Sequence, residues 1–455
     1  MSRIVEIAKR DFNGLLIEQG FTCDCGKHHG TPLKEVIIKA GALEQAAEVV
    51  KKYGASKVFL IADKNTYAAA GERVASLLDQ AGIPKTVFIF DDDYVQPTDT
   101  SLDKVLAGFD ASCDLVLGVG SGTINDISKL AAKETGVRYI SVATAPSMDG
   151  FVSDTSSMVM QGVKVSVPST VPLAVIADLD VLTAAPRKLL QAGFGDIMAK
   201  YVSTCEWRIS HLVTDEYYCE EIASLMRLAV HNCVSHVEDL AKGDHEAVRL
   251  LMESLILAGI AMSFAGTTRP ASGVEHYFSH LWDMRHLEFD TPKSLHGLQT
   301  GIGTILSLDI YDQIKKIVPD EAHARQYAQA FDLESWYEVI RSYLGKSGER
   351  LVELDKKERK YDKEAHAERL SRIINNWDQI LRIIEEEMPC AEELRKSYEI
   401  IGCPVSPVAI GISYCGTRRA FLLTKDIRFK YNASMLLWDL GKLEEVAQSL
   451  WQEAR

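Results

Sequence analysis

The stretch DLVLGVGSGTINDISKLAA (residues 114–132) joins a strand pattern to a helix pattern through a turn rich in glycine. Its apolar run ends at Gly118, Gly120 and Gly122, and Thr123 then opens an amphipathic helix. Glycines let a backbone approach a phosphate closely, and the first N–H groups of a helix attract an anion. The turn is neither the six-residue dinucleotide fingerprint nor a P-loop with its Lys-Ser/Thr. It therefore predicts a phosphate site, and a glycine turn without a ligand stays an open alternative.

The patterns on both sides of this turn predict a parallel sheet. Short apolar runs alternate with helical patterns from Leu33 to Leu179, as in successive βαβ units with right-handed crossovers. The predicted strands are LKEVII (33–38), KVFLIA (57–62), TVFIF (86–90), DLVLGV (114–119), RYISVA (138–143) and LAVIAD (173–178). The segment SMVMQGVKVSVP (157–168) predicts an inserted hairpin.

The pattern changes near residue 180, where strand runs become rare and long helical patterns continue to Arg455. We therefore expect two domains. Residues 1–179 would form an α/β dinucleotide-binding domain with an N-terminal hairpin, its parallel sheet flanked by helices. Residues 180–455 would form an all-α domain that binds metal and substrate.

Asp63 directly follows the strand pattern KVFLIA, where such folds often place a carboxylate on the adenosine ribose hydroxyls. A carboxylate there repels a 2′-phosphate, which favours NAD over NADP. The alternative interpretation is an N-cap for the helix that starts at KNTYAAAG, and the position alone does not choose between the two.

Composition excludes several classes of protein. The net charge of −14 and the pI near 5.4 argue against a nucleic-acid partner. The start of the chain shows no targeting peptide, and no long uninterrupted apolar run predicts insertion into a membrane. Nine scattered cysteines fit a reducing cytoplasm better than a disulfide framework.

The stretch FTCDCGKHHG (21–30) crowds two cysteines and two histidines together. Cys23 and Cys25 lack the two-residue gap of zinc knuckles, and no second Cys/His pair follows at finger-like distance. A hairpin turn at Gly26 is the favoured interpretation over a structural zinc site. Adventitious metal binding by Cys23, Cys25 and His28 stays open.

Histidines in the second half form a more promising pattern. GVEHYFSHLWDMRH places His276 and His280 four residues apart, hence on one face of a helix. His296 lies in SLHGLQTG at the start of another helix, and Asp196 lies in FGDIMAKYVS. An aspartate with two imidazoles suits a divalent cation that keeps an open position for substrate. Histidine pairs at this spacing also arise by chance on surfaces and in cores, and spacing alone leaves both options open.

Five motifs together carry a resemblance to a known family. The glycine turn, TAPSMDGFVS, GFGDIMAK, GVEHYFSH and LHGLQTG follow one another as in the iron-containing alcohol dehydrogenase and dehydroquinate synthase superfamily. Within it, GSGTINDISK and TAPSMDGFVSD resemble the sn-glycerol-1-phosphate dehydrogenases of the bacterial AraM-type branch. The resemblance implies a dehydroquinate synthase-like fold over nearly the whole chain.

The resemblance also implies roles for single residues. The turn from Gly120 to Asp126 would hold the pyrophosphate, and TAPSMDGFVS would line the nicotinamide side and, through Asp149, contact substrate hydroxyls. With Asp63, the predicted cofactor-binding residues are Gly120, Gly122, Thr123, Ile124, Asn125, Asp126, Thr144, Ala145, Pro146, Ser147 and Ser153. Asp196, His276 and His296 would bind the metal, and His280 would face the substrate. The predicted catalytic residues are Asp149, Asp196 and His280.

The implied reaction is the reversible, metal-dependent reduction of dihydroxyacetone phosphate to sn-glycerol 1-phosphate, feeding phosphoglycerolipid synthesis. The implied cofactors are NAD(H) by preference, NADP(H) as a second option, and one nickel or zinc ion per chain. An aspartate at residue 196, where dehydroquinate synthases would have glutamate, favours a dehydrogenase. We expect a cytoplasmic homodimer, with Lys164, Lys200, Arg269 and Arg285 as candidates for binding the substrate phosphate.

Two alternatives stay open. One is an NAD-dependent dehydrogenase of unphosphorylated polyols such as glycerol. The other, from a different class, is a non-catalytic nucleotide or metal sensor that keeps the fold. Intact candidate ligands at Asp196, His276 and His296 argue against the sensor.

Overall fold

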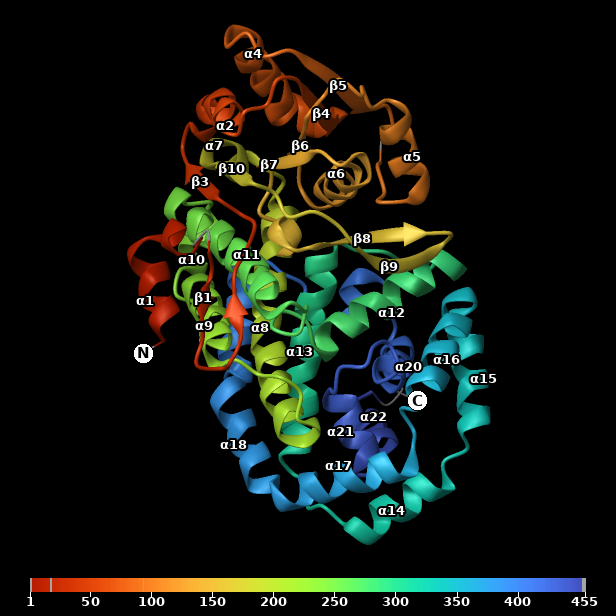
Figure 1. Ribbon diagram of the computed structural model, residues 1–455. Helices are drawn as coiled ribbons and strands as arrows, with labels where there is room; N and C mark the ends of the chain where they lie inside the picture. Colours follow the sequence, from red (N-terminus) through yellow and green to blue (C-terminus); the bar gives the residue numbers. More distant parts are fainter. Residues whose placement is uncertain (1, 17–18, 93, 452–455) are drawn as a thin grey trace. The chain divides into compact units, whose positions relative to one another are not determined.

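The computed structural model describes residues 2–16, 19–92 and 94–451. The chain packs as two compact units (Figure 1). We call residues 1–197 with 220–267 the sheet unit, and residues 198–219 with 268–455 the helical unit. The functional boundary after residue 179 stays a prediction, since packing groups the segment 220–267 with the sheet.

The sheet unit is built on six parallel strands, as the sequence predicted. In spatial order they are β3 (Glu35–Lys39), β10 (Ala174–Asp178), β7 (Arg138–Ala143), β6 (Leu115–Gly120), β4 (Val58–Asp63) and β5 (Lys85–Phe90). All six predicted apolar runs contain a strand of this sheet. The predicted inserted hairpin is also present, as the antiparallel pair β8 (Thr155–Met160) and β9 (Val163–Pro168).

The strands are mostly apolar because helices cover both faces of the sheet. Val58, Leu60 and Ala62 of β4 pack into one core cluster, and the alternating Phe59 and Ile61 pack into another. The first cluster holds residues of α2 (Ala46–Lys52) and α4 (Glu72–Gln80), and the second holds residues of α5 (Asp99–Ala107) and α6 (Gly122–Thr135). Helices on opposite faces of the sheet thus account for the two-residue alternation (Figure 1).

The strand order reverses direction between β4 and β6, which pair in parallel from Val58↔Leu115 to Ile61↔Gly118. The chain moves outward from β4 to β5 on one side, and from β6 through β7 to β10 on the other, where β3 forms the edge. In doubly wound sheets, a ligand binds at the carboxyl ends of the strands at such a reversal. Asp63 ends β4 and Gly120 ends β6, so both lie at this point.

The sheet unit also contains helices that precede the first strand of the sheet or follow its last strand in sequence. They are α1 (Arg3–Arg10), the 3₁₀ turn η1 (Phe12–Leu15), α7 (Leu179–Ala184), α9 (Glu220–Val234), α10 (Val237–Lys242) and α11 (His245–Ala265). An 18-residue window of α11 has a mean hydropathy of 1.7, but 78% of that window is buried inside the protein. We therefore interpret α11 as a core helix.

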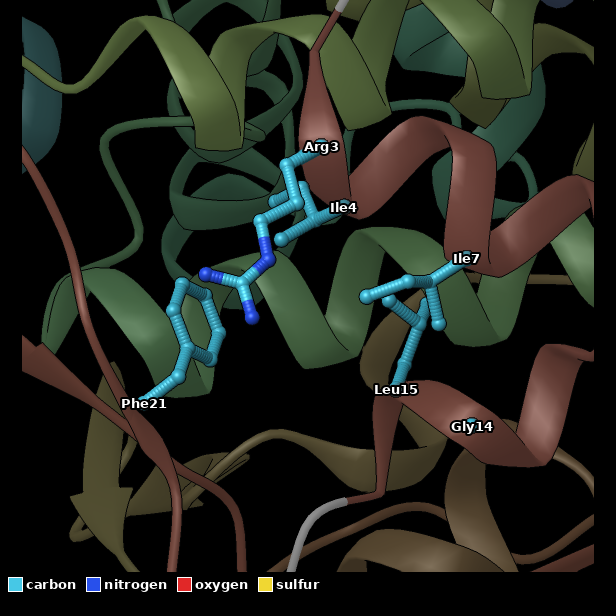
Figure 2. A pocket seen from close by; sticks show the side chains of 6 residues that line it. All are labelled: Arg3, Ile4, Ile7, Gly14, Leu15 and Phe21. Atoms are coloured by element: carbon cyan, nitrogen blue, oxygen red, sulfur yellow. The ribbon is translucent and has the colours of Figure 1, made fainter.

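An antiparallel hairpin, β1 (Phe21–Thr22) and β2 (His28–His29), lies near the start of the chain. Figure 2 shows a small hollow beside it, lined by Arg3, Ile4, Ile7, Gly14, Leu15 and Phe21. The side chain of Arg3 extends toward the ring of Phe21 in this view. The hollow contains none of the predicted site residues.

The helical unit confirms the helical pattern of the second half. It holds most of α8 (Arg187–Thr214), followed by α12 (Val274–Phe289) and α13 (His296–Ile314). The remaining helices are α14 (Glu321–Ala330), α15 (Leu333–Leu344), α16 (Lys346–Glu358), α17 (Lys363–Asn375), α18 (Trp377–Glu387), α19 (Ala391–Ile401), η5 (Pro407–Ile410), α20 (Tyr414–Thr424), α21 (Ala433–Asp439) and α22 (Leu443–Leu450). One large cluster of buried side chains joins α8, α12 and α13 to the later helices.

The packing of the sheet requires a glycine at residue 118, and a substitution there tests this requirement. A Cβ atom there would lie 2.6 Å from Ser128 Oγ and 2.9 Å from Tyr139 Oη. We expect Gly118→Ala to lower the free energy of unfolding by about 1–3 kcal/mol, the usual range for overpacking. Urea unfolding of the cofactor-free protein measures the change.

Gly122→Ala is the matched control for this variant. A Cβ atom at Gly122 would meet only Met148 Cγ, at 3.5 Å, which is an ordinary contact. Gly122→Ala should leave the stability unchanged or raise it slightly, because alanine favours a helix more than glycine does. Equal destabilisation by both substitutions would contradict this account of the packing.

Candidate active site

The turn between β6 and α6 leaves the start of a helix accessible to an anion. Ser121 occupies the N-cap position of α6, but its side chain makes no cap hydrogen bond. Its Oγ instead donates to the carbonyl of Ala145 at 3.2 Å and contacts Ser147 Oγ. The N–H groups of the first turn are therefore not used by a side-chain cap, and such groups bind phosphate well.

The loop after β7 lies beside this turn because β6 and β7 are neighbouring strands. Gly120 pairs with Ala143, and the N–H of Thr144 donates to the carbonyl of Gly120 at 3.2 Å. Ser147 follows in contact with Ser121. The structure thus brings the predicted residues Gly120, Gly122, Thr123, Thr144, Ala145, Pro146 and Ser147 into one region.

Asp63 adopts the alternative role that the sequence left open. It is the N-cap of α3 (Lys64–Thr66), where its Oδ1 accepts from the N–H of Thr66 at 2.8 Å. The Thr66 side chain accepts in turn from the N–H of Asp63 at 3.0 Å, which completes a capping box. Its role with a ribose stays a prediction, and the cap fixes the carboxylate at the carboxyl end of β4.

Three predicted cofactor residues have side chains that are committed to packing. Ile124 lies in the core beneath Gly120. Asn125 is buried, with its Oδ1 accepting from the hydroxyls of Tyr139 and Ser141. Ser153 lies behind the turn, within hydrogen-bond distance of the carbonyls of Gly150 and Thr155. A cofactor would therefore contact only the backbone of these residues, or neighbouring residues that they hold in place.

Sequence reasoning missed Lys129, which organises this region from the buried side of α6. Its Nζ donates to the carbonyl of Gly150 and to Ser153 Oγ, both at 3.0 Å. It also lies 3.6 Å from Asp126, whose pKa is raised to about 6 because burial outweighs the attraction of this ammonium. A lysine inside the apolar face of a helix was the signal that could have revealed it.

Helix α8 passes close to the loop after β7 because residue 193 is a glycine. A Cβ atom there would lie only 1.9 Å from the carbonyl oxygen of Pro146. One helical turn later, the buried Asp196 accepts through Oδ2 from the N–H of Asp149 at 2.9 Å. Two predicted catalytic residues, Asp149 and Asp196, are therefore in direct contact.

Asp196 also meets the two histidines that the sequence selected. One ligand atom each of Asp196, His276 and His296 lies within 4.8 Å of the other two. Asp196 is fixed by α8, an unbroken helix whose residues 198–214 belong to the helical unit. His276 comes from α12 and His296 begins α13.

A glycine lets the two histidine-bearing helices approach each other. A Cβ atom at Gly303 of α13 would lie 2.3 Å from the carbonyl oxygen of Glu275 in α12. The ring centroids of His276 and His296 are 5.3 Å apart. The close crossing therefore positions both imidazoles without a flexible loop.

Hydrogen bonds fix the tautomer of each imidazole. Nδ1 of His276 lies 2.8 Å from a carboxylate oxygen of Glu275, which only accepts, so this nitrogen carries the proton. Nδ1 of His296 lies 3.0 Å from Ser279 Oγ, whose own proton goes to Gln299 Oε1 at 2.7 Å. Nε2 of each ring is left as the lone-pair nitrogen that binds a metal. Sequence reasoning missed these supporting residues, although Glu275 is the direct neighbour of His276.

His280 lies beside this group without belonging to it. Its ring centroid is 6.5 Å from that of His276 and 6.1 Å from that of His296. Its side chain is half-buried, whereas His276 is buried. A histidine next to a ligand group, but outside it, suits contact with a substrate.

The four cationic side chains that the sequence offered for the substrate phosphate differ in their contacts. Arg269 is buried and donates to the carbonyls of Glu206 and Tyr431. Arg285 stacks on Tyr343, with its guanidinium carbon 4.3 Å from the ring centroid. Lys164 lies on β9. Lys200 follows Asp196 by one turn on the same face of α8, and its Nζ donates weakly to the carbonyl of Ala271 at 3.3 Å.

The chemistry of the donor set fits a divalent cation. One carboxylate and two neutral imidazoles suit zinc, nickel or iron, and three protein ligands leave a coordination position open. Burying the Asp196 carboxylate beside two uncharged rings also favours a positive charge at their centre.

Comparisons with known proteins agree with this fold. Residues 37–186 match the family described as iron-containing alcohol dehydrogenase. Among solved structures, the chain is similar to a probable glycerol dehydrogenase from Sinorhizobium meliloti, with a TM-score of 0.57 and 15% identity over 92% of this chain and 98% of that one. It is also similar to maleylacetate reductase from Agrobacterium tumefaciens, with a TM-score of 0.60 and 12% identity over 92% and 97% of the two chains. These identities support the fold alone.

Curated relatives are more similar in sequence. The chain is 32% identical to a glycerol-1-phosphate dehydrogenase (NAD(P)+) from Geobacillus thermodenitrificans over 92% of this chain and 95% of that protein. It is 36% identical to the enzyme of that name from Halalkalibacterium halodurans, over 64% and 73% of the two chains. It is also 35% identical to the enzyme of that name from Methanosarcina mazei, over 62% of this chain and 80% of that protein. With a parallel sheet, a glycine turn at its point of reversal and likeness along nearly the whole chain, this protein belongs to the glycerol-1-phosphate dehydrogenase family.

Proposed function

We propose that the protein catalyses the reversible, NAD(P)H-linked and metal-dependent reduction of dihydroxyacetone phosphate to sn-glycerol 1-phosphate. The observation that carries this proposal is the meeting of Asp196, His276 and His296, with both imidazoles presenting Nε2. The names of the curated relatives supply the substrate, since oxidation of the secondary alcohol of glycerol 1-phosphate gives this ketone.

The residues at the reversal of the sheet would hold the cofactor. Gly120, Gly122 and Thr123 would present backbone N–H groups to the pyrophosphate, as the uncapped start of α6 favours. The loop from Thr144 to Ser147, held beside that turn, would line the nicotinamide side. Asp63 would accept from a ribose hydroxyl, which favours NAD(H) over NADP(H). When bound, the nicotinamide supplies the hydride for C2 of the substrate.

Asp196, His276 and His296 would hold one divalent ion per chain, nickel or zinc. Such an ion, when bound, supplies a Lewis acid for the substrate carbonyl. The N–H of Asp149 fixes one oxygen of Asp196, and Glu275 and Ser279 fix the two rings, so the three ligands are positioned before substrate arrives. In the open position beside them, Asp149 would contact a substrate hydroxyl and His280 would carry the proton to the oxygen at C2.

Lys200 is our candidate for the substrate phosphate. It is buried and lies one turn from Asp196 on the same helix face, so its ammonium lies near the candidate metal ligands. A homodimer in the cytoplasm that supplies phosphoglycerolipid synthesis is the setting that we infer for this activity.

Substrate choice tests the proposed function. We expect kcat/KM with dihydroxyacetone phosphate to exceed that with dihydroxyacetone by at least about tenfold, because a charge-assisted hydrogen bond of about 1.5–3 kcal/mol requires the phosphate. Oxidation of NADH with each ketone, followed by absorbance, gives the ratio. Efficient turnover of the unphosphorylated ketone alone would identify a polyol dehydrogenase instead.

Removal of a ligand charge tests the metal site. In Asp196→Asn the amide oxygen can still accept from the N–H of Asp149, so the fold should persist while the anionic ligand is lost. We expect metal content to fall and kcat to drop by roughly a thousandfold or more, because a cation stabilises the transition state by several kcal/mol. NADH binding, followed by fluorescence, should remain measurable.

His286→Asn is the control for this test, because His286 lies on α12 but outside the ligand group. It should retain both metal and turnover. Full activity of Asp196→Asn, with metal still bound, would refute the metal site.

The glycine turn gives a separate test of cofactor binding. Since a Cβ at Gly122 meets no protein atom closer than 3.5 Å, Gly122→Ala should place a methyl group where a phosphate would otherwise approach. We expect the Kd for NADH to rise about tenfold, or about 1.4 kcal/mol, with stability unchanged. Thr135→Ala, at the far end of the same helix, is the control. An unchanged Kd for Gly122→Ala would show that the pyrophosphate does not bind at this turn.

A further inference from the structure

A second group of metal-ligating side chains lies outside the candidate active site. One ligand atom each of Cys23, Cys25, His29 and Cys219 lies within 4.8 Å of the others. Cys23, His29 and Cys219 are buried, and Cys25 is half-buried. Three thiols and one imidazole gathered in a buried position form one of the ligand sets that hold structural zinc.

The N-terminal hairpin gathers three of these four residues. In its strands Phe21 pairs with His29 and Thr22 with His28. The turn closes through hydrogen bonds from Cys23 N to the Lys27 carbonyl and from Gly26 N to the Cys23 carbonyl, both at 3.0 Å. Gly26 takes a φ of 83°, which glycine adopts readily, and so folds Cys25 back toward His29.

The strand alternation also decides which histidine takes part. His29 is fully buried, whereas its neighbour His28 is exposed and its Nε2 lies 2.6 Å from the carbonyl of Gln19. Adjacent residues of a strand point to opposite faces, so only one of the two can face the cysteines. The set with His28 that the sequence left open therefore had the wrong histidine.

His29 is held in the tautomer that a metal requires. Its Nδ1 lies 2.7 Å from the carbonyl oxygen of Phe264, which only accepts, so Nδ1 carries the proton. Nε2 is then the lone-pair nitrogen, and it lies 3.2 Å from Cys25 Sγ. A backbone carbonyl that orients a histidine through its other nitrogen is the usual support for a metal ligand.

Cys219 enters the group from a distant part of the sequence. It is bonded to Glu220, the first residue of α9, so this helix positions it. Helix α9 packs along α11, and α11 supplies the Phe264 carbonyl that holds His29. The same two helices thus place both the imidazole and the fourth ligand.

An apolar shell surrounds the imidazole. The rings of Phe21 and Phe264 lie 5.4 Å and 6.0 Å from that of His29, and 5.5 Å from each other. Phe21 also lines the hollow beside α1 (Figure 2). Such a shell limits the access of water and suits a permanent site rather than a transient one.

This group is distinct from the one that contains Asp196. The candidate active-site group consists of Asp196, His276 and His296, and the two groups have no residue in common. They are therefore separate candidate sites.

We propose that Cys23, Cys25, His29 and Cys219 bind one structural zinc ion that fastens the N-terminal hairpin to the start of α9 and the end of α11. Binding releases the protons of the thiols that become thiolates. Strands of only two residues give the hairpin few backbone hydrogen bonds, so a metal cross-link would contribute much of its stability. Four protein ligands close the coordination sphere, which separates this site from a catalytic one.

Cobalt substitution of the full-length chain tests the proposal. The active-site group contains no sulfur, so a thiolate-to-cobalt charge-transfer band in the near ultraviolet reports only the cysteine site. We expect the reduced, metal-free protein to develop this band on titration with Co²⁺, and zinc to abolish it. Asp196→Asn should keep the band in full, so failure of the catalytic proposal and failure of this one are distinguishable.

Substitution of single ligands completes the test. Cys25→Ser and Cys219→Ser should each weaken or abolish the band and lower the zinc content by one equivalent per chain. Cys415→Ser is the matched control, because Cys415 is also half-buried and lies outside the group. Wild-type protein that develops no band with excess Co²⁺, or a band that survives both substitutions unchanged, would overturn the proposal. A Cys23–Cys25 disulfide in protein purified without oxidant would overturn it as well.

Discussion

The buried carboxylate of Asp196 is the constraint on which the candidate active site depends. A carboxylate taken out of water is costly unless hydrogen bonds and positive charge replace its hydration. The N–H of Asp149 provides one such bond, and the imidazoles of His276 and His296 lie close to the carboxylate. The arrangement is therefore most stable with a cation at its centre. The same reasoning explains why a loop of the sheet unit carries the Asp149 N–H that steadies a metal ligand.

The sheet was predictable because its signal is local. Each strand is a short, mostly apolar run, the inner strands are buried on both faces, and each run can be recognised without knowledge of distant residues. The point of reversal could also be inferred, since the glycine turn needs an adjacent helix to approach at Gly118 and Gly120. It was harder to predict from the sequence which helices of the second half pack in the sheet unit. The segment 220–267 is helical, yet it packs in the sheet unit, and no local pattern distinguishes such helices from those of the other unit.

Sequence reasoning placed residues of the candidate site together only where the residue type and its position along the backbone point to the same role. Gly120, Gly122 and the loop after β7 lie together because neighbouring strands end together. Asn125 and Ser153 belong to the same motifs, but their side chains turn into the packing, where Asn125 binds Tyr139 and Ser153 binds Lys129. Sequence order does not say which way a side chain points in a turn. The three metal ligands were selected through family resemblance, since spacing alone relates only His276 to His280.

The two ligand groups show how sequence separation limits inference from spacing. Cys23 and Cys25 looked incomplete because the fourth ligand, Cys219, lies almost 200 residues away and has no local pattern. Asp196 lies within α8, and Cys219 follows the end of that helix.

One group has three candidate ligands and one has four, and this difference fits the catalytic and structural roles that we propose for them. A catalytic ion needs a vacant position for substrate, whereas an ion that holds a short hairpin is more stable when the protein fills every position.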